Sequence, residues 1–151
     1  MNINEAKNIL HQYLIDKKTF GNYHFKGSGT NGYAFVLNEQ VIKITKDMSE
    51  LKTALFFINN PHPAIIEYFD IYKIEEYGVI CMEELIPLDP IKHKNIIVSW
   101  HELISPDSEM SFNYNLSTIR MSILDLQSHY ELDLKELHWG NCGFDLRGNI
   151  K

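Results

Sequence analysis

Apolar residues recur at helical spacing at the start of the chain and again after residue 47. Asn4 is a typical N-cap residue, and it precedes four apolar residues on one helical face: Ile9, Leu10, Tyr13 and Leu14. This pattern predicts an amphipathic helix that ends near Asp16. Asp47 followed by Glu50 resembles a capping box, and four apolar residues after it lie near one face: Leu51, Leu55, Phe56 and Ile58. They predict a helix of about three turns that stops before Pro61.

Short β-rich runs lie between these two helices and after the second one. They occupy residues 20–25, 33–37, 41–45, 64–74 and 78–82. The "NEQ" that separates the second run from the third has the length of a hairpin turn. An acidic turn around Glu75 and Glu76 joins the last two runs. The pattern therefore predicts a three-stranded meander, a helix and two further strands.

The pattern becomes helical after Pro87. Residues 91–103 are a helix candidate, and residues 104–113 read as a polar loop. A stronger helix that ends near Glu131 is marked by five apolar residues: Leu116, Ile119, Ile123, Leu124 and Leu126. We therefore expect an α+β chain with an antiparallel-sheet lobe over residues 1–85 and a reduced helical lobe over residues 86–151. Ligands often bind between such lobes.

Composition narrows the class of partner. The chain has 151 residues, of which 44% are apolar, and it carries a net charge of −6. This charge disfavours non-specific nucleic-acid binding, which usually needs an excess of basic residues. No apolar stretch approaches the roughly 18 residues of a membrane span, and the N-terminus lacks the apolar core of a signal peptide. We expect a cytoplasmic protein that binds neither nucleic acid nor membrane.

The two cysteines, Cys81 and Cys142, cannot by themselves build a disulfide framework or a four-cysteine zinc site. Both lie in apolar runs, which is typical of reduced core residues.

Three glycines have G-x-G-x-x-G spacing: Gly27, Gly29 and Gly32. A dinucleotide-binding version of this motif opens a helix, but here a β-rich run follows. The phosphate-binding P-loop is excluded because Tyr33 and Ala34 follow the last glycine instead of Lys and Ser or Thr. Two interpretations stay open: a hairpin whose glycine-rich tip covers phosphates, or a flexible hairpin without a ligand.

A glycine hairpin, Lys43 on the next strand and Glu50 early in the next helix occur in the order of a protein kinase N-lobe, which the segment from Tyr23 to Leu88 resembles. The resemblance implies that Lys43 binds the α- and β-phosphates of ATP and that Glu50 positions it. It also implies that the hairpin covers the nucleotide with five residues: Gly27, Ser28, Gly29, Thr30 and Gly32. The alternative, when each residue is interpreted by itself, is that Lys43 is a charged residue on an edge strand and that Glu50 caps the helix.

The resemblance extends to the segment "MEEL". Met82 falls at the gatekeeper position, and the carbonyl of Glu83 and the N–H of Leu85 would contact adenine. The alternatives are that Met82 fills the core and that Glu83 and Glu84 are a solvated acidic pair.

Residues 136–151 resemble the D-L-H-x-G-N catalytic loop of phosphotransferases of the aminoglycoside type and of compact protein kinases. Asn141 then matches the metal-binding asparagine, and His138 is a loop-shaping residue. Glu136 stands where the family has its catalytic aspartate, which keeps the carboxylate but adds a methylene. In the family an Asp-Phe-Gly aspartate that holds magnesium would follow Lys151. We therefore expect a weak or incomplete magnesium site, unless another carboxylate such as Asp145 takes over.

The sequence thus predicts an ATP-binding, kinase-like protein in minimal or truncated form, with weak or impaired phosphotransferase activity toward a protein or small-molecule substrate. The alternative is a pseudokinase that regulates a protein partner without catalysis. A third hypothesis is a plain interaction protein, in which a second copy of the chain covers an apolar face of the reduced helical lobe.

Overall fold

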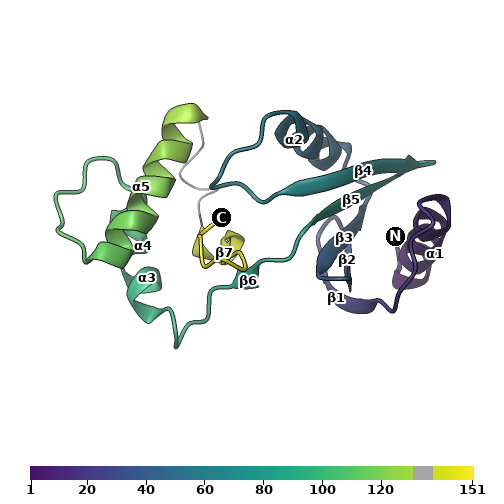
Figure 1. Ribbon diagram of the computed structural model, residues 1–151, viewed down its shortest axis with the longest axis horizontal. Coiled ribbons are helices and arrows are strands. Elements are labelled where there is room, and N and C mark those ends of the chain that lie inside the picture. Colours follow the sequence, from purple (N-terminus) through teal and green to yellow (C-terminus); the bar gives the residue numbers. More distant parts are fainter. Residues whose placement is uncertain (131–137) are drawn as a thin grey trace. The chain divides into compact units, whose positions relative to one another are not determined.

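The computed structural model describes residues 1–130 and 138–151 (Figure 1). The described residues divide into two compact units. The first unit comprises residues 1–61 and 66–84, and the second comprises residues 62–65 and 85–151. Together they have an α+β structure with a five-stranded antiparallel sheet and several helices, as the sequence predicted.

The sheet of the first unit contains β1 (His24–Gly29), β2 (Gly32–Leu37), β3 (Gln40–Thr45), β4 (Tyr68–Ile74) and β5 (Tyr77–Glu83). Its strand order is β1-β2-β3-β5-β4, and every neighbouring pair is antiparallel. The predicted order of the meander is confirmed, but its first strand lies later than the run at residues 20–25 and includes Gly27 and Gly29. Asn38 and Glu39 connect β2 to β3 with φ angles of 52° and 64°, which is the two-residue turn that matches the twist of a hairpin.

The first helix, α1 (Ile3–Asp16), has Asn2 as its N-cap, two residues before the predicted cap Asn4. The side chain of Asn2 accepts hydrogen bonds from the backbone of Asn4 and Glu5, and the Glu5 carboxylate accepts one from the backbone of Asn2 at 2.7 Å. This is a capping box. Asn2 is the N-cap instead of Asn4 because, of the two, only Asn2 has a glutamate three residues later.

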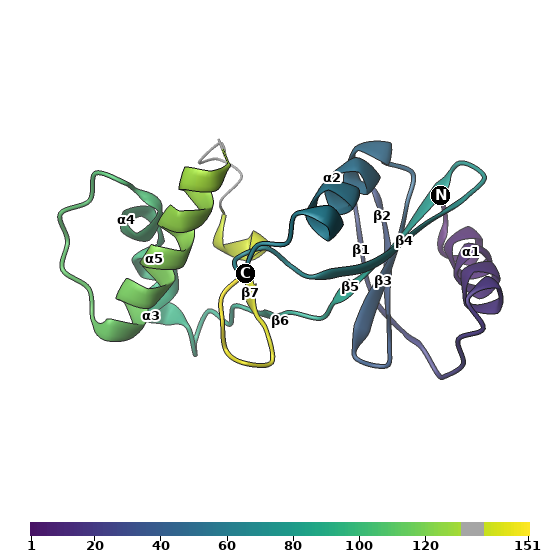
Figure 2. The same ribbon diagram turned by 45° about the horizontal axis from the view of Figure 1, so that its top comes forward.

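Helix α1 covers one face of the sheet, and α2 (Met48–Asn59) lies on the opposite side (Figure 2). Strand register separates the two faces, because side chains alternate along each strand. The face under α1 holds the apolar core of the first unit, whose buried members are Ala6, Leu10, Tyr13, Leu14, Phe35, Leu37, Ile42, Ile44, Tyr77, Val79 and Cys81. Lys43 alternates with Ile42 and Ile44 and therefore belongs to the α2 face.

Helix α2 buries less of its surface than its pattern predicted. Ala54 is its buried residue, whereas the side chains of Leu55 and Phe56 are 55% and 48% exposed. The helix approaches the sheet closely at Gly78, where an added Cβ would clash with the side chain of Leu51. Leu55 and Phe56, which the pattern places near one apolar face, are therefore not core residues, because the close approach falls on the first turns of the helix.

Two further boundaries differ from the prediction. Strand β4 begins at Tyr68, since residues 62–65 form a turn in which the Ile65 N–H donates to the His62 carbonyl at 3.0 Å. The helix predicted over residues 91–103 is divided into α3 (Lys94–Val98) and α4 (Trp100–Ile104). Three consecutive β-branched residues precede the division at Ser99, and such residues have low helix propensity.

The second unit contains α3, α4, α5 (Tyr114–His129), a 3₁₀ helix (Trp139–Asn141) and a small pair of strands, β6 (Ile86–Pro87) and β7 (Gly143–Phe144). Its buried core comprises Trp100, Leu103, Ile104, Leu116, Ile119, Ile123 and Ile150. The Arg120 guanidinium on α5 donates to the carbonyls of Glu102 and Ser105 at 2.6 and 2.8 Å. It thereby satisfies carbonyls at the C-terminal end of α4.

Both cysteines are free thiols. Burial raises the pKa of Cys81 and of Cys142 to about 11, so both thiols are protonated at neutral pH. Cys81 lies in the core of the first unit, whereas Cys142 is only half-buried. Among the helices of the described ranges, none has the length and apolar character to cross a bilayer.

Candidate functional site

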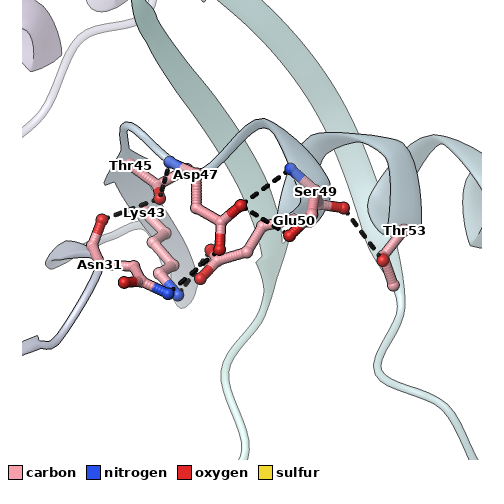
Figure 3. A network of polar contacts seen from close by, with 7 residues as sticks. All are labelled: Asn31, Lys43, Thr45, Asp47, Ser49, Glu50 and Thr53. Carbon is pink, nitrogen blue, oxygen red and sulfur yellow. Dashed lines mark hydrogen bonds and ion pairs between the residues drawn. The ribbon is translucent and has the colours of Figure 1, made fainter.

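An ion pair joins the centre of the sheet to α2. Lys43 Nζ lies 2.7 Å from Glu50 Oε2, and the two side chains are 31% and 26% exposed. Lys43 is on β3, which has a neighbour on each side, so it is not an edge-strand charge. Glu50 turns toward Lys43 and does not complete a capping box. Both single-residue alternatives are therefore replaced by one paired arrangement (Figure 3).

A polar network connects the glycine hairpin to the start of α2 (Figure 3). Asn31 at the hairpin tip donates from Nδ2 to Asp47 at 3.1 Å, and its carbonyl accepts from the fully buried hydroxyl of Thr45 at 2.8 Å. Asp47 caps α2 by accepting from the hydroxyl and the backbone N–H of Ser49. The Ser49 hydrogen bonds lower the pKa of Asp47, so this cap is ionised at neutral pH.

The three glycines differ in what the fold requires of them. A Cβ at Gly32 would clash with the carbonyl of Ile44, so the hairpin itself requires glycine there. A Cβ at Gly27 or Gly29 would meet nothing within 4 Å, and neither residue has a positive φ. The unliganded fold therefore does not explain why these two positions lack side chains. Glycine is also used where a ligand approaches the backbone closely.

The register places the hairpin and the ion pair in adjacent positions. Gly27 pairs with Ala34, Ala34 pairs with Lys43, and Lys43 pairs with Ile80. Residues in one such row point to the same face of the sheet. Gly27 and Lys43 are therefore two strands apart on the face that carries α2.

Met82 lies on the same face two residues further along the strands, in the row that also contains the buried residues Val36 and Val41. Met82 is half-buried and not a full core residue. Glu83 is not merely solvated, because its backbone N–H donates to the Glu67 carbonyl at 2.9 Å and its carboxylate accepts from the Glu67 N–H at 2.7 Å.

The acidic residue after it is also paired: Glu84 lies 2.6 Å from Lys26. Leu85 belongs to the second unit.

A polar hollow of about 440 Å³ lies at the hairpin tip. Its lining comprises Met1, Gly29, Thr30, Asn31, Gly32, Tyr33, Lys46 and Asp47. Ser28 precedes it on β1. Lys43 and Glu50 are not among the lining residues, whereas three residues of the glycine hairpin are: Gly29, Thr30 and Gly32.

Residues of the predicted catalytic loop fall in the second unit. Asn141 ends the 3₁₀ helix and is exposed, and its N–H donates to the His138 carbonyl at 2.8 Å. His138 caps this helix, since its Nδ1 accepts from the Gly140 N–H at 3.0 Å. The loop-shaping role expected for His138 is therefore observed. Glu136 lies outside the described residues.

Asp145 organises the turn that follows β7. Its Oδ1 accepts from the backbone of Arg147 at 2.9 Å and of Asn149 at 2.8 Å, and Lys151 Nζ lies 3.6 Å from Oδ2. Burial by itself raises the pKa of Asp145. Hydrogen bonds from Asn149 and Arg147 and the charge of Lys151 outweigh this effect, so the net pKa lies below its usual value. Its carboxylate is already engaged in the turn, which argues against the metal-binding role considered for it.

Asp145→Ala should destabilise the protein at neutral pH by about 1.5–3 kcal/mol, the range for hydrogen bonds to a charged group. Because folding lowers the pKa of Asp145, its contribution is present above the unfolded pKa of about 3.9 and is lost as pH falls below it. Urea unfolding of both proteins at pH 7 and below pH 4 measures this. Equal differences in unfolding free energy at both pH values would show that ionised Asp145 does not stabilise the turn.

Sequence reasoning missed two groups of residues. Asn31 and Thr45 link the hairpin to α2, and a polar residue at the end of an apolar strand was the available signal. His62 contacts Asp125 on α5 at 3.1 Å, although 63 positions separate them in the sequence. The one signal in the sequence was the spacing Asp-x-x-x-His from Asp125 to His129. Neither contact follows from local periodicity.

A scan against protein-family models finds no model that matches the chain, and a search of curated proteins finds no matching sequence. The geometry of the described residues therefore carries the functional argument.

Proposed function

We propose that the chain is an ATP-binding, kinase-like protein with weak or impaired phosphotransferase activity. The observation that carries the proposal is the 2.7 Å ion pair between Lys43 and Glu50. A lysine on a central strand, held by a carboxylate from the following helix, presents a positioned cation to a phosphate. Its ammonium has three donors, so contact with Glu50 leaves others for a ligand.

The glycine hairpin supports the same assignment. Gly27 shares a row with Lys43, and the open space at Gly27 and Gly29 would let phosphate oxygens approach the backbone N–H groups. In the proposal Ser28, Thr30 and Gly32 complete the cover, Met82 contacts the adenine ring, and the backbone of Glu83 and Leu85 binds its edge. Asn141 would hold magnesium and Glu136 would orient the substrate hydroxyl.

The second candidate is a pseudokinase that binds nucleotide and regulates a partner. It is favoured by Asp145, whose carboxylate is engaged by its own turn and by Lys151 and so is not open to a magnesium ion. Glu136 in place of the family's aspartate points the same way. Both candidates share the nucleotide site, so nucleotide binding is tested first.

Substitution of the hairpin glycines by alanine tests ATP binding separately from folding. Gly27→Ala and Gly29→Ala should each weaken ATP binding roughly tenfold or more, because a methyl group would obstruct a charge-assisted contact to phosphate. Without ATP, their unfolding free energy should stay within about 0.5 kcal/mol of the wild type. Titration calorimetry and urea unfolding measure the two effects.

Gly32→Ala is the matched control, since its Cβ would clash with the Ile44 carbonyl. It should lower stability by about 1–3 kcal/mol, as overpacking does. Unchanged ATP affinity in both Gly27→Ala and Gly29→Ala would show that the hairpin is only a turn.

A further inference from the structure

We propose that His62, Asp125 and His129 form a binding site for one transition-metal dication of the zinc class. This site is independent of the proposed nucleotide site, and all three residues belong to the second unit. Each offers one ligand atom, and these atoms lie within 4.8 Å of one another. Ligands of a tetrahedral zinc ion at 2.0–2.2 Å are about 3.3 Å apart, so modest side-chain rotation would bring all three into contact with one ion.

The donor set suits zinc better than calcium or magnesium. Two imidazoles and one carboxylate are ligands that zinc prefers, whereas calcium and magnesium prefer oxygen atoms. Three protein ligands leave a fourth position for water. One carboxylate gives the site a single negative charge, which attracts a dication.

The site is built by two segments that are far apart in sequence. Asp125 and His129 lie one turn apart on α5, so their side chains share a face of the helix. His62 comes from the turn before β4, and its side chain is 6% exposed. Its Nε2 lies 3.1 Å from Asp125 Oδ2, and its ring packs against the His129 ring with centroids 5.1 Å apart. A nine-tenths buried imidazole therefore presents a ring nitrogen to the helix.

The metal would compete with three existing hydrogen bonds, one of which joins His62 Nε2 to Asp125 Oδ2 at 3.1 Å. His129 Nδ1 donates to the Asp125 carbonyl at 2.9 Å, but this ring is 57% exposed and can place its proton on Nε2 instead. His62 Nδ1 accepts from the Ala64 N–H at 3.0 Å, so ligation through Nε2 would put a proton on Nδ1 and break that bond. These costs predict a weaker site than one whose histidines already have the ligating tautomer.

Metal binding would fasten the turn at residues 62–65 to the last turn of α5. The expected consequence is a zinc-dependent rise in melting temperature, because an ion that binds the folded state stabilises it. The turn follows the last residue of α2, Asn59, by only three positions.

Zinc titration of EDTA-treated, dialysed protein by calorimetry tests the site. We expect one zinc ion per chain, a rise in melting temperature, and absorption bands of four-coordinate cobalt when cobalt replaces zinc. His129→Ala and Asp125→Asn should each lower zinc affinity at least tenfold. Both positions are exposed, so these variants should fold, which circular dichroism checks.

His101→Ala is the matched control, because His101 is an exposed histidine on α4 outside the cluster. It should bind zinc as the wild type does. The proposal is overturned if the wild type shows no saturable zinc binding, or if either His129→Ala or Asp125→Asn binds zinc unchanged. It is also overturned if His101→Ala loses affinity to the same extent, since binding would then be non-specific.

Discussion

Lys43→Met should abolish the rise in melting temperature that ATP causes in the wild-type protein. At a hundredfold excess over its dissociation constant, a ligand of the folded state contributes about 2.7 kcal/mol, or roughly 5–10 °C for a chain of this size. Methionine keeps the length of the side chain but removes the ammonium that would contact phosphate. Thermal unfolding of both proteins with and without ATP measures the difference.

The variant should fold normally without ATP. The Lys43–Glu50 pair is about one-third exposed, and such pairs contribute roughly 0.2–1 kcal/mol. Lys46→Met is the comparison variant, because it removes a similar ion pair, with Glu76 at 2.9 Å, that does not involve Glu50. Lys46 also lines the hollow at the hairpin tip. Loss of the ATP response in Lys46→Met but not in Lys43→Met would move the nucleotide to that hollow and contradict the proposal.

Glu136→Gln should lower any phosphoryl-transfer rate by roughly 10²- to 10⁴-fold, the range for loss of a general base. Glutamine keeps the size of the side chain but cannot accept or orient the substrate proton as a carboxylate does. Glu136→Asp should retain or increase the rate, because it restores the side chain of the resembling phosphotransferases. Steady-state assays of ATP turnover, with affinity measured separately, provide the comparison.

This experiment separates the two functional candidates. If Glu136 is only a loop residue, the Asp and Gln variants should bind and hydrolyse ATP alike, and stability should change within about 1 kcal/mol. Equal rates in protein that binds ATP would favour the pseudokinase.

Much of the first unit could be predicted because its determinants are local. Short β-rich runs separated by turns gave the five strands, and the two-residue turn at Asn38 and Glu39 follows from the spacing of those runs. Cap residues placed both helix starts within two residues. Errors arose where tertiary packing decides, as at Leu55 and Phe56, whose apolar side chains lie outside the close contact of α2 with the sheet.

The sequence predicted which residues form the candidate site and their order along the chain, but not the contacts between them. Lys43 and Glu50 could be named from the sequence, but two alternatives for them remained until the ion pair was observed. The difference between Gly32 and the other two glycines could not be read from the motif, because it depends on how closely β3 approaches. The contact of His62 with Asp125 depends on how distant segments pack, so periodicity could not reveal it.

The most direct test of the account is a calorimetric titration of the wild-type protein with ATP and, in parallel, with adenosine. We expect ATP to bind at one site per chain and clearly more tightly than adenosine, because Lys43 and the backbone of the glycine hairpin would contact the phosphates. Absence of saturable ATP binding, or equal affinities for ATP and adenosine, would contradict a phosphate-binding role for Lys43 and the hairpin.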